Sequence, residues 1–445
     1  MKTLEMMRRN AFWILDSIKG RKVRKAYLTI REIDRLDSED SRIRRYQKKA
    51  FQKLKRHVCQ TTDFYAAFSE CQFSEFPVIT KNDLKENLAG FLSKVYKKEN
   101  LFQMATSGST GTPFISYQDE EKKRRVNAEI IYYSEKAGYR LGQNLSYIRT
   151  IVKQNQKSWL RQFLQNQTLI HCEKLDDAGI EKMLRQLAEK SKQGPVTLLA
   201  YASTYTAIKN YAQKKGIKRA DNIRISGLIS GAEILYDSTR ESVEKLFGAK
   251  AFSRYSNEEN GVLGQEEGKN NVFVINEADY IIEILDEEGN PLPDGETGRI
   301  VVTDLYNYGM PMIRYDTGDV GAITTEKIHG RRKRVISGFS GRKIDVIFDV
   351  EGRALSPYAI VNNMWSFSDI RQFQFIQKGK KSYFLKLNAD ISEKRKQELI
   401  TMLEKLLGEG AEIVLEEVKE IPVLASGKRR YIVNEWRAED AKSLY

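Results

Sequence analysis

The segment IEKMLRQLAEKSKQGPVTLLAY, residues 180–201, joins an amphipathic helix to an apolar strand. Gly194-Pro195 ends the helix, and the apolar run Val196–Ala200 follows directly, which is typical of a buried strand. The apolar positions of the helix recur at helical spacing and predict one core-facing side, formed by Ile180, Met183, Leu184 and Leu187.

The same pattern repeats twice along the chain. A second strand is predicted over Ile223–Ile229, after a helical segment that contains Ile208 and Tyr211. A third is predicted over Ala249–Arg254, after a helix around Val243–Phe247 that ends at Gly248. Alternation of strands with helices indicates a parallel sheet wound with helices.

Polar clusters stand where these three strands end. They are Tyr201-Ala202-Ser203, Ser230-Gly231-Ala232-Glu233 and Tyr255-Ser256-Asn257-Glu258-Glu259. Open sheets of this kind bind ligands outside the carboxyl ends of their strands, so we expect one site at this edge.

A second candidate is the loop Thr106-Ser107-Gly108-Ser109-Thr110-Gly111-Thr112-Pro113-Phe114. Its glycines permit backbone angles that let amide N–H groups converge on an anion, and its hydroxyls donate further bonds. A P-loop has Lys and then Ser or Thr after the last Gly, which this sequence lacks. The predicted flanking strands Leu101–Ala105 and Phe114–Tyr117 indicate a hairpin. A solvated turn is the alternative interpretation.

The chain around these motifs predicts a mixed α/β protein with two parts. Residues 1–342 form a large nucleotide- and acid-binding domain with a mainly parallel sheet, an antiparallel β region from Asn271 to Thr303 and a helical N-terminal part over residues 1–100. Residues 343–445 form a small, mobile α+β lid domain with a helix over Ser392–Leu407.

Composition narrows the functional classes. The 445 residues, 41% hydrophobic, suffice for a large core, and no apolar run approaches the roughly 20 residues of a membrane span. Three cysteines without paired spacing and three histidines argue against a disulfide framework or a zinc site. The net charge of +14 favours anionic partners, but no nucleic-acid-binding motif is present, so we expect none of that class. We expect a cytoplasmic protein.

The N-terminal helix admits two interpretations. One apolar side is formed by Leu4, Met7, Ala11, Ile14, Leu15 and Ile18, and a basic run from Lys19 to Lys25 follows. We expect this side to pack on the main domain, as most amphipathic helices do. The alternative is a peripheral contact with an anionic membrane at its inner face.

In this order, the motifs resemble those of the adenylate-forming superfamily of acyl-CoA synthetases, peptide-synthetase adenylation domains and luciferases. Within it, the chain is most similar to the phenylacetate-CoA ligase-like and capsule-biosynthesis branch. The resemblance spans about residues 101 to 430. It implies that the loop from Thr106 through Ser107, Gly108, Ser109, Thr110, Gly111 and Thr112 holds the phosphates of ATP.

The resemblance also implies roles at the strand ends and beyond. Gly231, Ala232 and Glu233 line the adenine, Tyr255 stacks on it, and Ser256 and Asn257 line the same nucleotide site. Glu259 ligates Mg²⁺, which suits a hard cation that seeks oxygen ligands. Asp319 binds the ribose hydroxyls, Arg342 contacts ribose and phosphate, and Lys428 in the turn Ser426-Gly427-Lys428 bridges the acid and the α-phosphate.

The implied function is ATP-dependent activation of a carboxylic acid as an acyl-adenylate, followed by transfer to coenzyme A. Transfer to a carrier-protein thiol, or to an amine or hydroxyl of a polysaccharide precursor, is an alternative. A nucleotide-binding protein without turnover is another. Two positions depart from the family: Ile344 with Asp345 at the hinge, and Tyr147–Val152 in place of the Gly-rich segment of the aryl pocket, so phenylacetate itself is not predicted.

Overall fold

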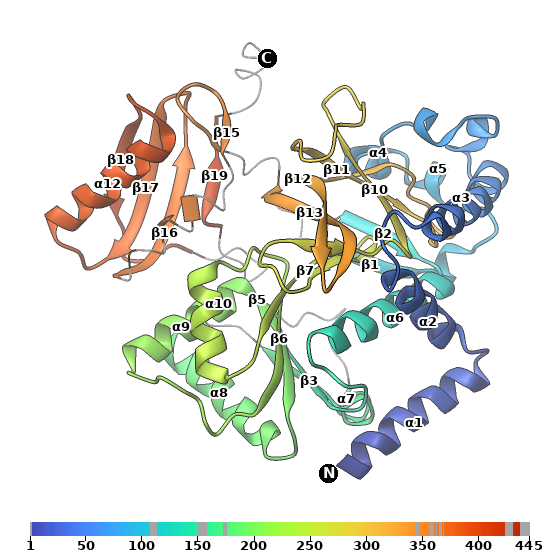
Figure 1. Cartoon of the computed structure of the whole chain (residues 1–445), viewed down its shortest axis with the longest axis horizontal. Coiled ribbons are helices and arrows are strands. Elements are labelled where there is room, and N and C mark those ends of the chain that lie inside the picture. The colour runs from blue at the N-terminus through green and yellow to red at the C-terminus, as the bar shows by residue number, and fades with distance from the viewer. Residues whose placement is uncertain are drawn as a thin grey trace.

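The protein folds around one large mixed sheet with a separate small sheet near its C-terminus, as the computed structural model shows (Figure 1). This confirms the predicted α/β class. The structure describes residues 2–106, 114–149, 158–171, 176–342, 347–355, 360–361, 363–364, 367, 369–422 and 430–436.

The first hundred residues are helical, as predicted. The main helices are α1 (Lys2–Ile18), α2 (Lys22–Asp34), α3 (Ser41–Thr61), α4 (Lys81–Glu86) and α5 (Leu88–Phe91), with short 3-10 turns at Ala66–Phe68, Phe73–Glu75 and Lys98–Asn100. The Asp40 side chain caps α3 by accepting a hydrogen bond from the Arg42 amide. The inner side of α3 then packs Phe51, Leu54 and Val58 into a core shared with β2.

The loop of the sequence analysis joins two short strands that pair as an antiparallel hairpin, as predicted. They are β1 (Phe102–Thr106) and β2 (Phe114–Gln118). Residues 107–113 lie outside the described part of the chain. The helix after the hairpin is α6 (Glu120–Lys136), capped by the Asp119 side chain.

Half of the large sheet is parallel, in the order β4-β3-β5-β6-β7. Its strands are β3 (Asn144–Arg149), β4 (Gln167–His171), β5 (Val196–Tyr201), β6 (Ile225–Gly231) and β7 (Ala251–Asn257). The helices between them are α7 (Trp159–Gln165), α8 (Asp177–Ser191), α9 (Ala202–Lys214) and α10 (Asp237–Phe247).

Strands β6 and β7 begin two residues later than predicted and end later. The Ile223 amide donates to the Ala220 carbonyl in a turn, so the strand begins only after it. A close backbone approach is built into β6, where a Cβ on Gly227 would lie 1.7 Å from the Ala137 carbonyl oxygen. Only glycine admits the end of α6 at this distance.

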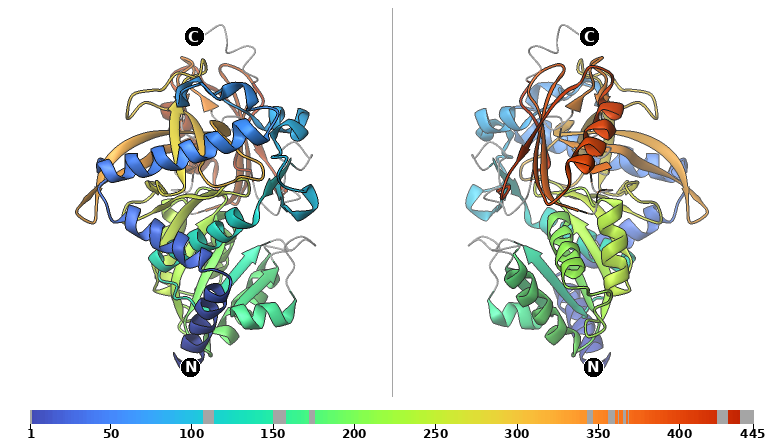
Figure 2. Two further views of the ribbon diagram at one scale, coloured as in Figure 1. Left: turned by 90° about the vertical axis from the view of Figure 1, so that its right-hand side faces the viewer. Right: turned by 90° about the vertical axis from the view of Figure 1, so that its left-hand side faces the viewer.

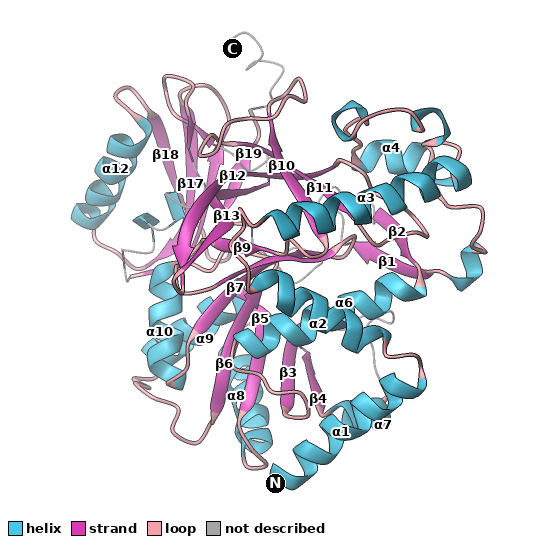
Figure 3. Cartoon of the chain, turned by 45° about the vertical axis from the view of Figure 1, so that its right-hand side comes forward, coloured by secondary structure: helices cyan, strands magenta, loops and turns pink. Residues whose placement is uncertain are grey.

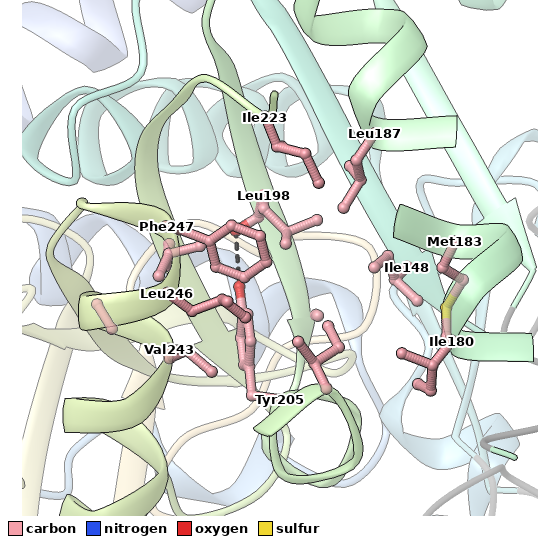
Figure 4. Close-up of a cluster of buried hydrophobic side chains, with 14 of the residues drawn as sticks. Ile148, Ile180, Met183, Leu187, Leu198, Tyr205, Ile223, Val243, Leu246 and Phe247 are labelled. Carbon is pink, nitrogen blue, oxygen red and sulfur yellow. Dashed lines mark hydrogen bonds between the residues drawn. The ribbon is translucent and has the colours of Figure 1, made fainter. Parts of the chain in front are cut away.

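The core against one face of the parallel strands is apolar (Figure 4). The predicted inner side of α8 supplies Ile180, Met183 and Leu187, and α10 supplies Val243 and Phe247. The Tyr205 hydroxyl lies 3.0 Å from the Leu198 carbonyl, so the one polar atom of this ring is satisfied. Burying each such aliphatic side chain contributes roughly 1.5–3 kcal/mol, which fixes the strand ends that carry the candidate site.

The other half of the large sheet is antiparallel, in the order β10-β11-β12-β13-β9-β8, and joins β7 through β8. The strands are β8 (Gly261–Glu266), β9 (Phe273–Ile275), β10 (Tyr280–Leu285), β11 (Gly298–Asp304), β12 (Tyr315–Ile328) and β13 (Arg331–Arg342). This confirms the antiparallel region expected after Asn271, although β9 begins only at Phe273.

The C-terminal residues form a separate four-stranded sheet, β18-β17-β16-β19, covered by α12 (Glu393–Leu407). Its strands are β16 (Ile370–Gln377), β17 (Ser382–Ala389), β18 (Glu412–Glu417) and β19 (Ile432–Asn434), preceded by the small pair β14 (Ile347–Phe348) and β15 (Ala354–Leu355). Rings of Tyr236 and Tyr431 meet edge to face at 6.2 Å, joining this sheet to the segment after β6. The domain boundary at residue 342 stays a prediction.

Helix α1 contradicts the expected packing. Its predicted apolar side faces solvent: Leu4, Met7, Ile14, Leu15 and Ile18 are all at least half exposed. The helix instead rests on its opposite side, where Asp16 is buried and accepts from the Val23 and Arg24 amides at 3.0 and 2.9 Å. These hydrogen bonds to the first turn of α2 are made by the side of α1 that faces inward.

Candidate functional site

The structure brings the three polar strand ends together at one sheet edge. Strands β5, β6 and β7 are neighbours, with Tyr201 paired to Gly231 and Gly231 paired to Arg254. Gly231, Tyr255, Ser256 and Asn257 lie within the strands, not after them, because β6 and β7 run further than predicted. The edge is nevertheless the one that the sequence indicates.

The turn after β6 has a backbone suited to close ligand approach. Ala232 has φ 65°, a left-handed conformation that is uncommon for a residue with a Cβ and clusters at functional sites. Glu233 is held beside it, because its Oε2 accepts from the Ser203 amide at 2.7 Å. Ser203 is in the first turn of α9, where the helix dipole favours an anion.

Tyr255 connects this edge to the antiparallel half of the sheet. Its hydroxyl donates to Asp319 Oδ2 at 2.8 Å, and its ring packs on Phe339 with centroids 4.8 Å apart. Burial, followed by the nearby Asp319 charge, raises the pKa of Tyr255 well above its ordinary value. The hydroxyl therefore stays protonated, and it orients the Asp319 carboxylate.

Asp319 and Arg342, both predicted nucleotide contacts, are directly opposite each other on β12 and β13. This pairing was not evident from the sequence, because 23 positions separate them. The strand pairing gives their backbone positions, while the Arg342 side chain is outside the described structure.

Glu259 is the candidate metal ligand, and its carboxylate is buried, with 2% exposure. Lys81 Nζ lies 2.9 Å from Oε1, and the Tyr315 hydroxyl donates to the same oxygen at 3.2 Å. The Gln118 side-chain amide donates to the Glu259 backbone carbonyl at 3.2 Å, so the base of the β1–β2 hairpin lies beside the backbone of this residue.

Lys81 reaches this position because the residue two positions before it, Ile79, pairs with the start of β12. The Ile79 amide donates to the Arg314 carbonyl at 3.0 Å, and the Asp316 amide donates to the Ile79 carbonyl at 2.8 Å. Two residues later Lys81 begins α4, with Nζ 5.8 Å from the centroid of the Phe114 ring. Phe114, the first residue of β2, therefore lies beside the Lys81–Glu259 pair.

The donor set fits Mg²⁺ of the kind that accompanies ATP. Among the described residues, no cluster of three or more His, Cys, Asp or Glu side chains is arranged to hold a metal. Mg²⁺ usually binds through one or two carboxylates, with substrate phosphates and waters completing the octahedron. The contacts of the Glu259 carboxylate with Lys81 and Tyr315 both use Oε1, which leaves acceptor capacity on Oε2.

A buried polar network supports the turn that carries Glu259. Lys122 Nζ lies 2.8 Å from Asp304 and 3.7 Å from Glu129, and all three side chains are fully buried. The Tyr280 hydroxyl lies 2.9 Å from both Glu129 Oε1 and the Asn260 carbonyl. Burial raises the pKa of Glu129 well above its usual range, although the Lys122 charge opposes this. The network fixes Asn260, the residue after Glu259.

Sequence reasoning missed Lys81, Tyr315, Phe339 and the Lys122–Glu129–Asp304 network. The capping box of Thr80 and Asp83 marks the start of α4, but no local signal indicates that Lys81 meets Glu259. Several predicted site residues lie outside the described part of the chain. They are Ser107, Gly108, Ser109, Thr110, Gly111, Thr112, Ile344, Asp345 and Lys428. Thr106 ends β1, and its side chain is likewise not described.

Comparison with known proteins finds similar sequences and similar folds over most of the chain. The CapK C-terminal domain family matches residues 347–435. Protein CapK of Staphylococcus aureus is 25% identical over 95% of this chain and 96% of its own length. Phenylacetate-coenzyme A ligase of Pseudomonas putida is 25% identical over 68% of this chain and 72% of its own. The chain is a homologue of CapK and the phenylacetate-CoA ligases.

The fold of this CapK homologue is that of the adenylate-forming ligases. A crystal structure of 2-hydroxyisobutyryl-CoA ligase in the postadenylation state, in complex with R3-HIB-AMP, superposes with a TM-score of 0.73. The two chains are 17% identical, and the match covers 92% of each. Within the described residues of the CapK homologue, no helix is both long and apolar enough to cross a bilayer.

Proposed function

We propose that this CapK homologue is an ATP-dependent ligase. It activates a carboxylic acid as an acyl-AMP, releases pyrophosphate and transfers the acyl group to coenzyme A. The observation that carries the proposal is the junction of the hairpin base, Glu259 and the Tyr255–Asp319 pair around one sheet edge. The relatives support it, because the Pseudomonas putida homologue is named a phenylacetate-coenzyme A ligase and the superposed 2-hydroxyisobutyryl-CoA ligase is in complex with R3-HIB-AMP.

In this proposal, ATP lies across the edge. The turn Gly231, Ala232 and Glu233 lines the adenine, with Ser256 and Asn257 beside it, and Tyr255 contributes its ring. Asp319, oriented by the Tyr255 hydroxyl, accepts hydrogen bonds from the ribose hydroxyls. The loop from Thr106 to Thr112 holds the β- and γ-phosphates, and Phe114, which comes after this loop in the sequence, lies beside the Lys81–Glu259 pair.

The chemistry requires charge neutralisation. A carboxylate oxygen attacks the α-phosphorus, the bond to the bridging oxygen of pyrophosphate breaks, and that oxygen carries the electron pair away. Both reactants are anionic, so cationic groups must be in place where charge develops. Mg²⁺ held by Glu259 would supply part of that charge, and Lys428 and Arg342 are the proposed protein cations.

The second step needs no further ATP. The thiolate of coenzyme A attacks the acyl carbon, the acyl–oxygen bond breaks, and AMP leaves with the bridging oxygen. We propose that residues 343–445 act as the lid that moves between the two steps. The contact between Tyr236 and Tyr431 is where this part meets the nucleotide-lining segment.

A pyrophosphate-release screen over carboxylic acids tests the proposal, with coenzyme A, a carrier-protein thiol or an amine as acceptor. We expect one acid class to stimulate pyrophosphate and AMP formation, and Glu259→Gln to abolish it. Glu258→Gln is the matched control, because this neighbouring carboxylate is exposed. Nucleotide binding without acid-dependent pyrophosphate release from any acid would indicate a binding protein and contradict the proposal.

A further inference from the structure

Exposed apolar side chains are concentrated on two helices. The described residues include fourteen large apolar side chains that are exposed, and ten of them belong to α1 and α7. On α1 they are Leu4, Met6, Met7, Ile14, Leu15 and Ile18; on α7 they are Trp159, Leu160, Phe163 and Leu164. Ile18 and Trp159 are 77% and 76% exposed. Scattered exposed apolar residues are normal, but a cluster of this size marks an interaction site.

The two helices form one surface. The Arg8 guanidinium lies over the Phe163 ring, 5.2 Å from its centroid, and α1 runs beside α7 in Figure 3. Figure 2 shows the N-terminal end at one pole of the molecule, with the C-terminal sheet toward the other. We call these ten side chains the α1–α7 surface.

The orientation of α1 is fixed by its other side. A Cβ on Gly142 would lie 2.2 Å from the Glu5 carbonyl oxygen, so the helix backbone rests directly on this glycine. The Trp13 ring meets the Tyr27 ring of α2 at 5.9 Å. Since the inner side is occupied by these contacts, the apolar stripe of α1 points away from the protein.

Positive charge borders the α1–α7 surface. Residues 2–25 contain eight basic and two acidic side chains. Asp16 is buried and bonded to backbone amides, and Glu5 is only partly exposed. The exposed basic residues are Arg9, Lys19, Arg21, Lys22, Arg24 and Lys25. Apolar and aromatic side chains flanked by Lys and Arg are the composition of helices that lie in the interface of an anionic bilayer.

We propose that the α1–α7 surface binds this protein to the surface of an anionic membrane, with both helices lying in the interface. Leu, Ile, Trp and Phe side chains enter the boundary between headgroups and acyl chains, and the basic residues contact anionic headgroups. A second copy of the chain fits this surface less well. In a two-fold contact the same patch meets itself, and residues 2–25 offer only two acidic side chains to their eight basic ones.

Vesicle co-sedimentation of the full chain tests the proposal. One set of vesicles is phosphatidylcholine alone, and in the other set one quarter of the lipid is phosphatidylserine. We expect binding only to the anionic vesicles, and loss of binding at high salt. Ile14→Glu with Ile18→Glu and Trp159→Glu should abolish binding. The matched control is Val95→Glu with Val414→Glu, which changes two exposed apolar residues elsewhere and should bind like the native protein.

A second variant, which removes charge, keeps the test valid if circular dichroism shows that the Glu variant folds poorly. Lys19→Ala with Lys22→Ala and Lys25→Ala should lower the partition coefficient roughly a hundredfold, at about fivefold per lysine. The proposal would be overturned if the native protein did not bind anionic vesicles. It would also be overturned if the Glu variant and the Lys→Ala variant both bound as well as the native protein does. A dimer in sedimentation that the Glu variant converts to monomer, without vesicle binding, would assign the surface to a second copy. Nucleotide binding in solution should not change, so this test is independent of the proposed catalytic activity.

Discussion

The contact between Lys81 and Glu259 can be tested by removing its charges one at a time. Lys81→Met keeps most of the aliphatic side chain and deletes the ammonium, which lies 5.8 Å from the centroid of the Phe114 ring. The buried Glu259 carboxylate then retains the Tyr315 hydroxyl, 3.2 Å away, as its donor among the contacts described above. Glu259→Gln deletes the other charge and keeps the shape of the side chain.

The structure sets the size of the effect. At 2.9 Å and an effective dielectric constant of about 20, the direct attraction is roughly 6 kcal/mol. The Lys81 side chain is 39% exposed, so water screens much of this attraction. The free-energy cost of burying the Glu259 carboxylate offsets much of what remains. The net effect should resemble a hydrogen bond to a charged group, about 1.5–3 kcal/mol.

Urea unfolding of four proteins measures this coupling without nucleotide. They are the native chain, the two single variants and the double variant, which together form a double-mutant cycle. We expect a coupling free energy of about 1.5–3 kcal/mol, because the second substitution costs little once the first partner is gone. Coupling below about 0.5 kcal/mol would show that the two side chains do not interact in solution, and would refute the reasoning.

Three further predictions concern the site. Asp319→Ala should weaken AMP binding roughly 10- to 100-fold by calorimetry, because it removes hydrogen bonds to a charged group; unchanged affinity would exclude the ribose role. Lys428→Ala should slow acid-dependent pyrophosphate formation roughly 10²- to 10³-fold, yet use added acyl-AMP at near the native rate. A normal adenylation rate would show that the activating cation lies elsewhere. Because burial raises the pKa of Glu129, the folded state holds its proton more tightly than the unfolded state. The contribution of Glu129 to native stability should therefore fall as pH rises above about 4.5, by at most roughly 1.4 kcal/mol per unit, and Glu129→Gln should change the pH dependence of urea unfolding by this contribution; an identical pH dependence would contradict it.

Local patterns predicted the parallel part of the sheet well, because its helices are followed by Gly and Pro residues that end a helix. Gly194-Pro195 ends the segment after α8, and Gly248 ends α10 in the left-handed conformation with φ 63°. The apolar side of α8 faces the core as its spacing indicates. The polar clusters at the strand ends follow from the same alternation, since parallel strands place their carboxyl ends at one edge.

Contacts between distant segments could not be predicted in this way. Lys81 meets Glu259 only because Ile79 bonds to the backbone on either side of Tyr315, and an isolated Lys in a charged segment carries no such information. The α1 error has a related cause. Periodicity shows that a helix has an apolar side, but not what covers it. In this protein the Asp16 contacts and Gly142 turn the opposite side of α1 inward.

Oxygen labelling tests the central claim most directly. The carboxylic acid identified by the pyrophosphate screen is supplied with both carboxylate oxygens as ¹⁸O, together with ATP and the acceptor. If the acid attacks the α-phosphorus, one labelled oxygen bridges carbon and phosphorus in the acyl-AMP and leaves with AMP after transfer. We therefore expect AMP that carries one ¹⁸O by mass spectrometry. Label in inorganic phosphate, with ADP as the nucleotide product, would show activation at the γ-phosphate and would contradict the account.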